Sequence, residues 1–192
     1  SIVIPRLKQI QRELELAKSS YKREINPTPD QINELISLYQ AGQLQSVEKS
    51  CRRLLEIHSD SVIILNLLGA VLATQGRLKE ALSIYNQAIR LQPDSAENYN
   101  NRGNVLRDLG QLDESLFNYD QAVRLEPKVA EYYSNQTNTL RGLGRLEEAL
   151  SSCEQAIRLK PDSAENYNNR GNVLRDMNRL EEALSSYHQA IR

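Results

Sequence analysis

A period of 34 residues runs through most of this chain and limits its possible folds more than any other feature. The segment at residues 93–108 recurs letter for letter at residues 161–176, two periods later. Four residue types keep the single period: Pro93, Pro127 and Pro161; Gly42, Gly76, Gly110 and Gly144; Ala88, Ala122, Ala156 and Ala190; Tyr99, Tyr133 and Tyr167. Several series at one period predict an array of similar units that bury their apolar faces by stacking on one another.

Each unit is predicted to contain two helices joined by a turn. In the unit that begins at Ala96, Asp94 or Ser95 can cap the first helix, and apolar residues then follow at helical spacing. Gly110 ends that helix, and Pro127 stops the second one. The predicted organisation is an N-terminal helix and linker (1–27) followed by units 28–61, 62–95, 96–129, 130–163 and 164–192, the last one incomplete.

Small and aromatic residues occur in a fixed order within these units. The small residue of the first helix is Gly69, Gly103 or Gly171. The small residue of the second helix is Ala81, Ser115, Ala149 or Ala183, and the aromatic residue that follows it is Tyr85, Tyr119 or Tyr187. This order resembles the tetratricopeptide repeat (TPR), a helix-turn-helix motif, over residues 28–192. The resemblance implies an all-α fold, a right-handed α-α solenoid (superhelix) of about five TPR units.

Several positions depart from the family pattern. The first unit is degenerate, as terminal repeats often are. Thr137 replaces the small glycine of the fourth unit, so that helix pair is expected to splay slightly. Asn178 replaces a turn glycine, and asparagine tolerates a positive φ better than most residues. Arg102 and Arg170 stand where the family prefers leucine, so their charged heads are expected to extend from the apolar layer into solvent.

A separate helix is predicted before the array, over residues 5–25. Its apolar residues form one narrow stripe, and a segment with two prolines then breaks the chain at residues 26–29. We favour a helix that covers the open end of the first repeat. A self-pairing coiled coil and a helix lying on a membrane surface are the alternatives, the second because residues 1–27 carry a net charge of +3.

The last unit stops early in the sequence. Arg192 is the 29th residue of a 34-residue unit, ahead of the expected closing proline, so we expect the chain to be a fragment of a longer protein. A solenoid needs a polar terminal cap. The second helix of the fifth unit instead carries an apolar stripe at Leu180, Leu184, Tyr187 and Ile191. That uncapped C-terminal unit is expected to promote self-association of the chain.

Composition argues against several classes of function. The net charge of −1 gives no basic surface for nucleic acid, and no apolar run is long enough for a membrane span. Cys51 and Cys153 are too few for a disulfide scaffold, and His58 and His188 have no neighbours that would complete a metal site. No phosphate-binding glycine motif occurs. We therefore predict a cytoplasmic protein with no catalytic residues, no metal and no cofactor.

The candidate binding residues lie on the first helix of units three to five. The TPR resemblance implies that these helices line the concave face of the superhelix. Three rows recur there at the period of 34: Asn101, Asn135 and Asn169; Asn104, Asn138 and Asn172; Arg107, Arg141 and Arg175. Asparagine is a poor residue inside helices, so we infer that it is kept for binding. The alternative is recent duplication, which would have copied the asparagines without any selection for binding.

An amide side chain offers both a donor and an acceptor, as does the backbone of an extended peptide. The asparagine rows resemble the ladder that lines the TPR superhelix of O-linked N-acetylglucosamine transferases, where it holds substrate polypeptide. A clamp for a C-terminal carboxylate is disfavoured, because Glu131 and Glu165 stand where such a clamp needs lysines.

We therefore predict a non-catalytic protein–protein interaction scaffold that binds an extended peptide or partner segment in the concave groove. The alternative is the substrate-recruiting arm of a larger multidomain enzyme such as a glycosyltransferase. RNA binding is a third possibility. It is disfavoured by the net negative charge of residues 28–192 and by the absence of stacking aromatic residues from the predicted groove.

Overall fold

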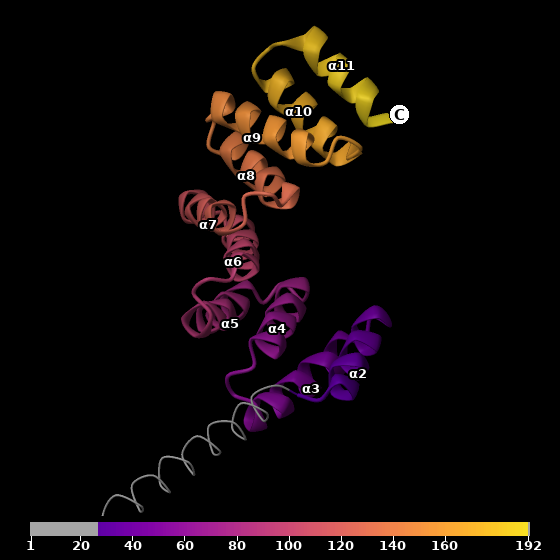
Figure 1. The fold of residues 1–192 in the computed structure, drawn as a ribbon, viewed down its shortest axis with the longest axis vertical. Coiled ribbons are helices and arrows are strands. Elements are labelled where there is room, and N and C mark those ends of the chain that lie inside the picture. Colours follow the sequence, from indigo (N-terminus) through magenta and orange to yellow (C-terminus); the bar gives the residue numbers. More distant parts are fainter. Residues whose placement is uncertain (1–26, 192) are drawn as a thin grey trace, which may run out of the picture. The chain divides into compact units, whose positions relative to one another are not determined.

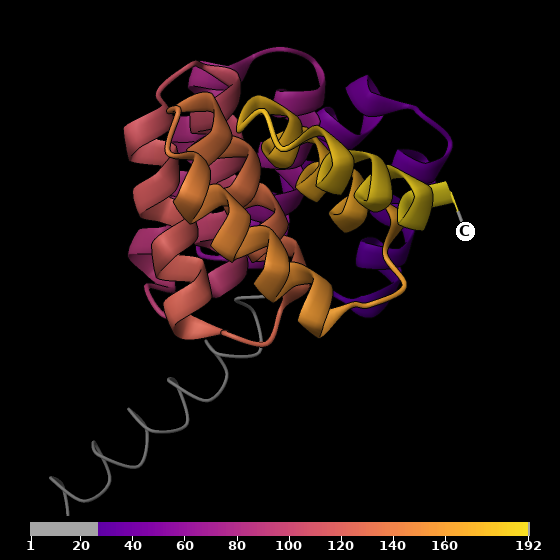
Figure 2. The same cartoon turned by 90° about the horizontal axis from the view of Figure 1, so that it is seen from above.

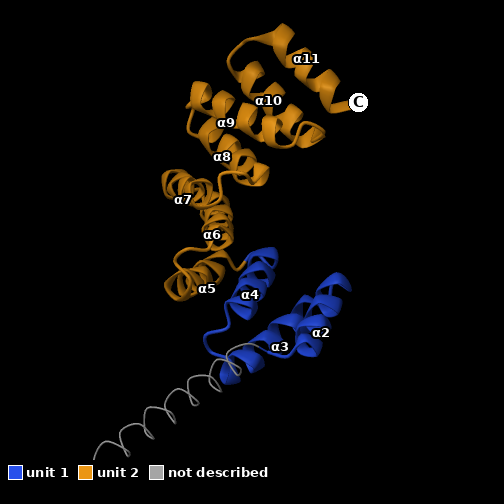
Figure 3. Cartoon of the chain, in the orientation of Figure 1, with its two compact units in different colours: residues 1–76 blue, residues 77–192 orange. Residues whose placement is uncertain are grey.

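The computed structural model describes residues 27–191, and their regular structure consists of helices alone (Figure 1). Within this range there is no strand, which confirms the predicted all-α class. The helix predicted over residues 5–25 lies outside the described residues. The chain divides into two compact units, residues 1–76 and 77–192 (Figure 3). Because that boundary falls inside the predicted repeat 62–95, each unit is treated by itself below.

The N-terminal unit contains three consecutive helices: α2 (Pro29–Gln40), α3 (Leu44–Ile57) and α4 (Val62–Thr74). Helix α3 packs against both α2 and α4. The Thr28 side chain accepts a hydrogen bond from the backbone N–H of Gln31, and the Gln31 side chain accepts one from the backbone N–H of Thr28. This capping box satisfies backbone donors at the start of α2. The degenerate first repeat therefore still forms a helix pair, as predicted.

The C-terminal unit contains the remaining seven described helices: α5 (Leu78–Leu91), α6 (Ala96–Asp108), α7 (Leu112–Leu125), α8 (Ala130–Gly142), α9 (Leu146–Leu159), α10 (Ala164–Asp176) and α11 (Leu180–Ile191). Each helix packs against the next, and short turns join them (Figures 1 and 2). The first helices of successive repeats also contact one another, α6 with α8 and α8 with α10. Side chains on these three helices can therefore form one continuous face.

The turns that separate the paired helices depend on a positive φ. Gly110 has a φ of +77° and Gly144 a φ of +72°, while Asn178 occupies the equivalent turn with a φ of 61°. The backbone N–H of the residue after each turn position bonds to a carbonyl five residues earlier, for example Gln111 to Leu106 at 2.9 Å. Such bonds satisfy the last carbonyls of the first helix. The prediction that asparagine can replace the turn glycine is confirmed.

A close contact between paired helices requires a residue without a side chain at Gly103. A Cβ atom placed there would lie 2.7 Å from Cε1 of Tyr119, so the tyrosine ring occupies the space that a side chain would need. In the fourth repeat both positions change together: Thr137 replaces the glycine and Cys153 replaces the tyrosine. The expected splaying of this helix pair rested on Thr137 alone. The smaller Cys153 offsets part of the added volume, and the splaying stays a prediction.

Arg102 connects two second helices instead of only extending into solvent, which corrects the prediction for this residue. Its Nε donates to Oδ1 of Asn118 at 2.7 Å, and its Nη1 donates to Oδ1 of Asn86 at 3.0 Å. The guanidinium also lies 5.7 Å from the centroid of the Tyr99 ring. Gln136 bridges the corresponding positions of the next repeat with bonds of 2.7 and 2.8 Å. This position of the repeat therefore carries a polar link between neighbouring units.

Both cysteines stand at the position of the second-helix tyrosine, and both belong to the core of their own unit. Cys51 and Cys153 are fully buried free thiols. Burial, with a further contribution from a nearby glutamate in each case, raises the pKa of each thiol to about 12. Both thiols therefore remain protonated at neutral pH, where they act as small apolar side chains.

Candidate functional site

The candidate site is the face formed by the predicted asparagine and arginine rows on α6, α8 and α10. The structure places all nine of these residues within the C-terminal unit: Asn101, Asn104 and Arg107 on α6, Asn135, Asn138 and Arg141 on α8, and Asn169, Asn172 and Arg175 on α10. We call this set the first-helix face. Its members differ in how far their side chains are already engaged within the protein.

Two members of the first asparagine row, Asn135 and Asn169, link neighbouring repeats. Nδ2 of Asn135 donates to Oδ1 of Asn100 at 2.9 Å, and Nδ2 of Asn169 donates to Oγ of Ser134 at 2.9 Å. Both acceptor residues are buried and belong to the first helix of the preceding repeat. A buried amide that loses its partner is costly, so these bonds contribute to the stability of the stack. The amides of Asn135 and Asn169 are therefore partly structural.

The second asparagine row is engaged in two of its three repeats. The Tyr119 hydroxyl donates to Oδ1 of Asn104 at 2.7 Å, and the Tyr187 hydroxyl donates to Oδ1 of Asn172 at 3.0 Å. In the repeat between them Cys153 replaces the tyrosine, and the side chain of Asn138 has no hydrogen bond within residues 27–191. Asn138 is partly exposed, so both its donor and its acceptor are available to a ligand.

The arginine row is paired with aspartates. Nε of Arg141 lies 3.1 Å from Oδ2 of Asp176, and Nη2 of Arg175 lies 3.0 Å from Oδ1 of the same aspartate. Nη2 of Arg107 lies 3.4 Å from Oδ1 of Asp108. These ion pairs are partly exposed and therefore weak, but they neutralise much of the positive charge at this end of the first helices.

A polar hollow of about 310 Å³ lies beside the asparagine rows, between the starts of α8 and α10. Of the predicted site residues, only Asn135 lines it. The hollow is lined by Ala130, Glu131, Ser134, Asn135, Lys160, Ser163, Glu165 and Asn166. Lys160 was missed by the sequence analysis because it lies after the end of α9, and only the packing of the repeats brings it to the first helices.

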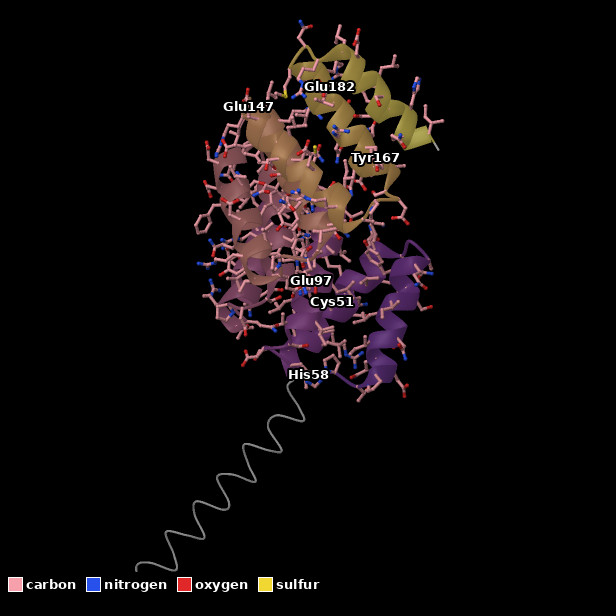
Figure 4. The ribbon with its side chains drawn as sticks, turned by 45° about the horizontal axis from the view of Figure 1, so that its top comes forward. Cys51, His58, Glu97, Glu147, Tyr167 and Glu182 are labelled. Atoms are coloured by element: carbon pink, nitrogen blue, oxygen red, sulfur yellow. The ribbon has the colours of Figure 1, made fainter. Side chains whose placement is uncertain are left out.

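Among the residues that the structure describes, the histidines, cysteines and carboxylates form no group of three that could hold a metal ion. Glu182, labelled in Figure 4, lies at the start of α11, and its Oε1 is 2.7 Å from Nε of Arg179. The pKa of the Glu182 carboxyl is lowered, mainly by hydrogen bonding to that arginine. Among the described helices, none has the length and apolar character needed to cross a membrane.

Antiparallel helix pairs with close-packed small residues define this molecule as a helical repeat protein. Models of the TPR repeat match residues 71–106, 103–136 and 138–177, and a further tetratricopeptide repeat model matches residues 164–192. The chain belongs to the tetratricopeptide repeat family. The family resemblance predicted from the sequence is thus confirmed, and this fold supports a role as a protein–protein interaction scaffold.

Several solved structures share the fold at low sequence identity. A MamA from Desulfovibrio magneticus RS-1 is 16% identical with a TM-score of 0.76, over 86% of this chain and 96% of that one. PilF of Pseudomonas aeruginosa is 20% identical with a TM-score of 0.77, over 84% of this chain and 74% of that one. YrrB, described as a TPR protein with an unusual peptide-binding site, is 24% identical with a TM-score of 0.68, over 91% and 90%. No curated protein matches the chain.

Proposed function

We propose that the array is a non-catalytic scaffold that binds an extended peptide or partner segment along the first-helix face. The observation that carries this proposal is the side chain of Asn138, a partly exposed amide without a hydrogen bond in the described structure. It lies on the middle one of three adjoining first helices. A peptide-binding site in YrrB, a protein of the same fold, supports the proposal as an analogy.

The chemistry of the face suits backbone recognition. Asn138 can donate to a peptide carbonyl and accept from a peptide N–H, whereas Asn104 and Asn172 already accept from tyrosine and keep their amide N–H groups for donation. Recognition of this kind depends little on the ligand's side chains. None of the comparisons supports the alternative of a recruiting arm on an enzyme. The cytoplasmic location stays a prediction from composition.

The proposal is tested by titrating the parent and Asn138→Ala with fluorescent extended peptides and measuring the dissociation constants by anisotropy. Each hydrogen bond lost on truncation is worth about 0.5–1.5 kcal/mol. Because the amide can form two, the variant is expected to bind roughly tenfold more weakly. The fold should be unaffected, since the removed amide has no partner within the described residues.

We also propose that copies associate through α11. Leu184 is 56% exposed, whereas Leu116 at the equivalent position of α7 is 6% exposed and packs in one cluster with Leu140 of the next first helix. Ile191 is 82% exposed on the same helix. In an inner repeat the next helix covers this apolar face of the second helix. In α11, the last helix that the structure describes, the same face is open, and a second copy of the chain could cover it.

Light scattering at increasing protein concentration tests this association. The parent is expected to form dimers or larger species, and Leu184→Lys should reduce them, because a charged residue disfavours an apolar contact. Ser185→Lys is the matched control, since Ser185 is also exposed on α11 and lies outside the apolar stripe. A parent that stays monomeric at every concentration, or equal effects of the two variants, would refute the proposal.

A further inference from the structure

The first helix pair of the array contains a hollow at a place where an inner repeat has a tyrosine ring. The hollow measures about 240 Å³ and lies between α2 and α3, and Gln31, Leu54 and Ile57 are among the residues that line it. In the third repeat Tyr99 stands at the position of Gln31 and packs in one cluster with Ala122, the equivalent of Leu54. A cavity of roughly 150 Å³ already holds a benzene ring, so this hollow has room for an aromatic side chain.

One side of α2 is also open, although the corresponding side of an inner first helix is covered. Leu140 on α8 packs in one cluster with Leu116 of the preceding second helix and is 3% exposed. Leu38 occupies the same position on α2, three periods earlier, and is partly exposed. Within residues 27–191 no second helix precedes α2. A further helix in that place would bury Leu38, which the hydrophobic effect favours.

Residues 5–25 carry the apolar pattern of a second helix, in register with the repeats. Ile10, Leu14, Ala17 and Tyr21 precede by 102 residues, or three periods, four residues of α7: Leu112, Leu116, Tyr119 and Val123. Leu14 therefore corresponds to Leu116, and its counterpart on α2 is Leu38. The segment ends two residues before Thr28, which caps α2, so it is tethered next to the helix whose side is open.

The same register directs Tyr21 to the hollow. Val123, its equivalent on α7, packs in one cluster with Tyr132 at the start of α8. Tyr21 accordingly faces the start of α2, where Gln31 lines the hollow. Because Gln31 has no ring, the ring of Tyr21 can take the space that Tyr99 fills in the third repeat.

A charge pair follows from this register as well. Nε2 of Gln136 on α8 donates to Oδ1 of Asp120 on α7 at 2.7 Å, which links the two helices. The equivalents three periods earlier are Glu34 on α2 and Lys18, which carry opposite charges. Glu34 forms no ion pair within residues 27–191, although the exposed Arg53 lines the same hollow. An ammonium group from Lys18 would therefore meet a carboxylate that is still available.

The residues on the other side of the segment are polar. On α7 this side faces the first helix of the same repeat: Oγ of Ser115 donates to the carbonyl oxygen of Gly103 at 2.8 Å, and Ala122 packs in a cluster with the start of α6. The equivalents three periods earlier are Glu13 and Ser20. A helix with one apolar and one polar side suits the end of a solenoid, where one side meets water.

We propose that residues 5–25 form a second helix that packs on α2, places the Tyr21 ring in the hollow between α2 and α3, and so caps the array. Leu14 then packs on Leu38, and Lys18 lies beside Glu34. The occupant of the hollow is thus a segment of the same chain. The cap uses none of the residues of the first-helix face, so it stands or falls independently of peptide binding.

The first test compares hydrogen exchange in the parent chain, Tyr21→Ala and Lys22→Ala, followed by mass spectrometry. Because the Tyr21 ring is buried in the proposed contact, its loss is expected to speed exchange of the α2 amides roughly tenfold or more. Lys22 is the matched control, since its equivalent Arg124 is exposed on α7. Lys22→Ala should exchange like the parent, and the amides of α8 should be unaffected in both variants. Equal effects of the two variants on α2 would overturn the proposal.

Charge reversal tests the register. Lys18→Glu and Glu34→Lys are each expected to speed exchange of the α2 amides about twofold to fivefold, the effect of losing a partly exposed ion pair. The double variant restores opposite charges and should return toward the rate of the parent. Strictly additive effects of the two changes would overturn the pairing of Lys18 with Glu34 and the register that it defines.

NMR distinguishes the possible occupants of the hollow. Nuclear Overhauser contacts are expected between the Tyr21 ring and the methyl groups of Leu35 and Leu54, within one chain. If a mixture of labelled and unlabelled chains showed these contacts between different copies, the hollow would hold the segment of a second copy, and capping of the segment's own chain would be overturned. If Tyr21 made no such contact and its loss left α2 exchange unchanged, the hollow would be left to another partner and the proposal would be wrong.

Discussion

Replacing Gly103 with alanine is expected to lower the free energy of unfolding by about 1–3 kcal/mol, the usual cost of adding volume to a well-packed contact. The new Cβ would lie 2.7 Å from Cε1 of Tyr119, and that ring is buried and held by the hydrogen bond from its hydroxyl to Asn104. Neither the Tyr119 ring nor its partner Asn104 can yield easily, so the helices α6 and α7 would have to separate. Urea unfolding followed by circular dichroism measures the loss.

The fourth repeat supplies the control for this prediction. Gly103→Thr should be at least as damaging as the alanine variant, whereas Gly103→Thr combined with Tyr119→Cys copies the pair formed by Thr137 and Cys153. The double variant is expected to recover part of the lost stability, and only part, because it also removes the hydroxyl that bonds to Asn104. Strictly additive losses would show that the two positions do not compensate each other.

Asn135→Ala and Asn138→Ala are expected to differ in stability although they lie on one helix, three residues apart. The first removes a 2.9 Å hydrogen bond to Asn100, which is 3% exposed, and leaves a buried acceptor without that donor. This should cost about 1–3 kcal/mol, offset slightly by the better helix propensity of alanine. The second removes no bond within the described residues and should be neutral or slightly stabilising. The same unfolding measurement compares them, and equal losses would contradict this reading.

The period of 34 residues was sufficient to predict the helical array, because each series of glycines, alanines and prolines has one local role in every repeat. The error concerned a residue read by itself: Arg102 was compared with the family's leucine, although its partners Asn86 and Asn118 are each 16 residues away along the chain. The splaying expected from Thr137 stays a prediction, and it took no account of Cys153, which also lies 16 residues away. Compensation between paired helices becomes visible only when equivalent positions of two repeats are compared.

The nine candidate residues were placed on the correct helices, yet the sequence alone did not distinguish engaged amides from available ones. That distinction depends on neighbours in other helices: Asn135 meets a residue 35 positions earlier, and Asn138 is available because Cys153 has no hydroxyl. The aspartate partners of the arginines were visible in the sequence, but pairing between Arg141 and Asp176 requires the packing of consecutive repeats.

The most direct test of peptide recognition by the first-helix face is the affinity of Asn138→Ala for extended peptides of unrelated sequence. The account predicts that this variant unfolds like the parent and binds every peptide roughly tenfold more weakly, because Asn138 contacts ligand backbone through an otherwise unused amide. Ser151→Ala, an exposed change on α9, serves as the control and should bind as the parent does. Parent-like affinity of Asn138→Ala across the whole panel would contradict the account and leave duplication as the origin of the asparagine rows.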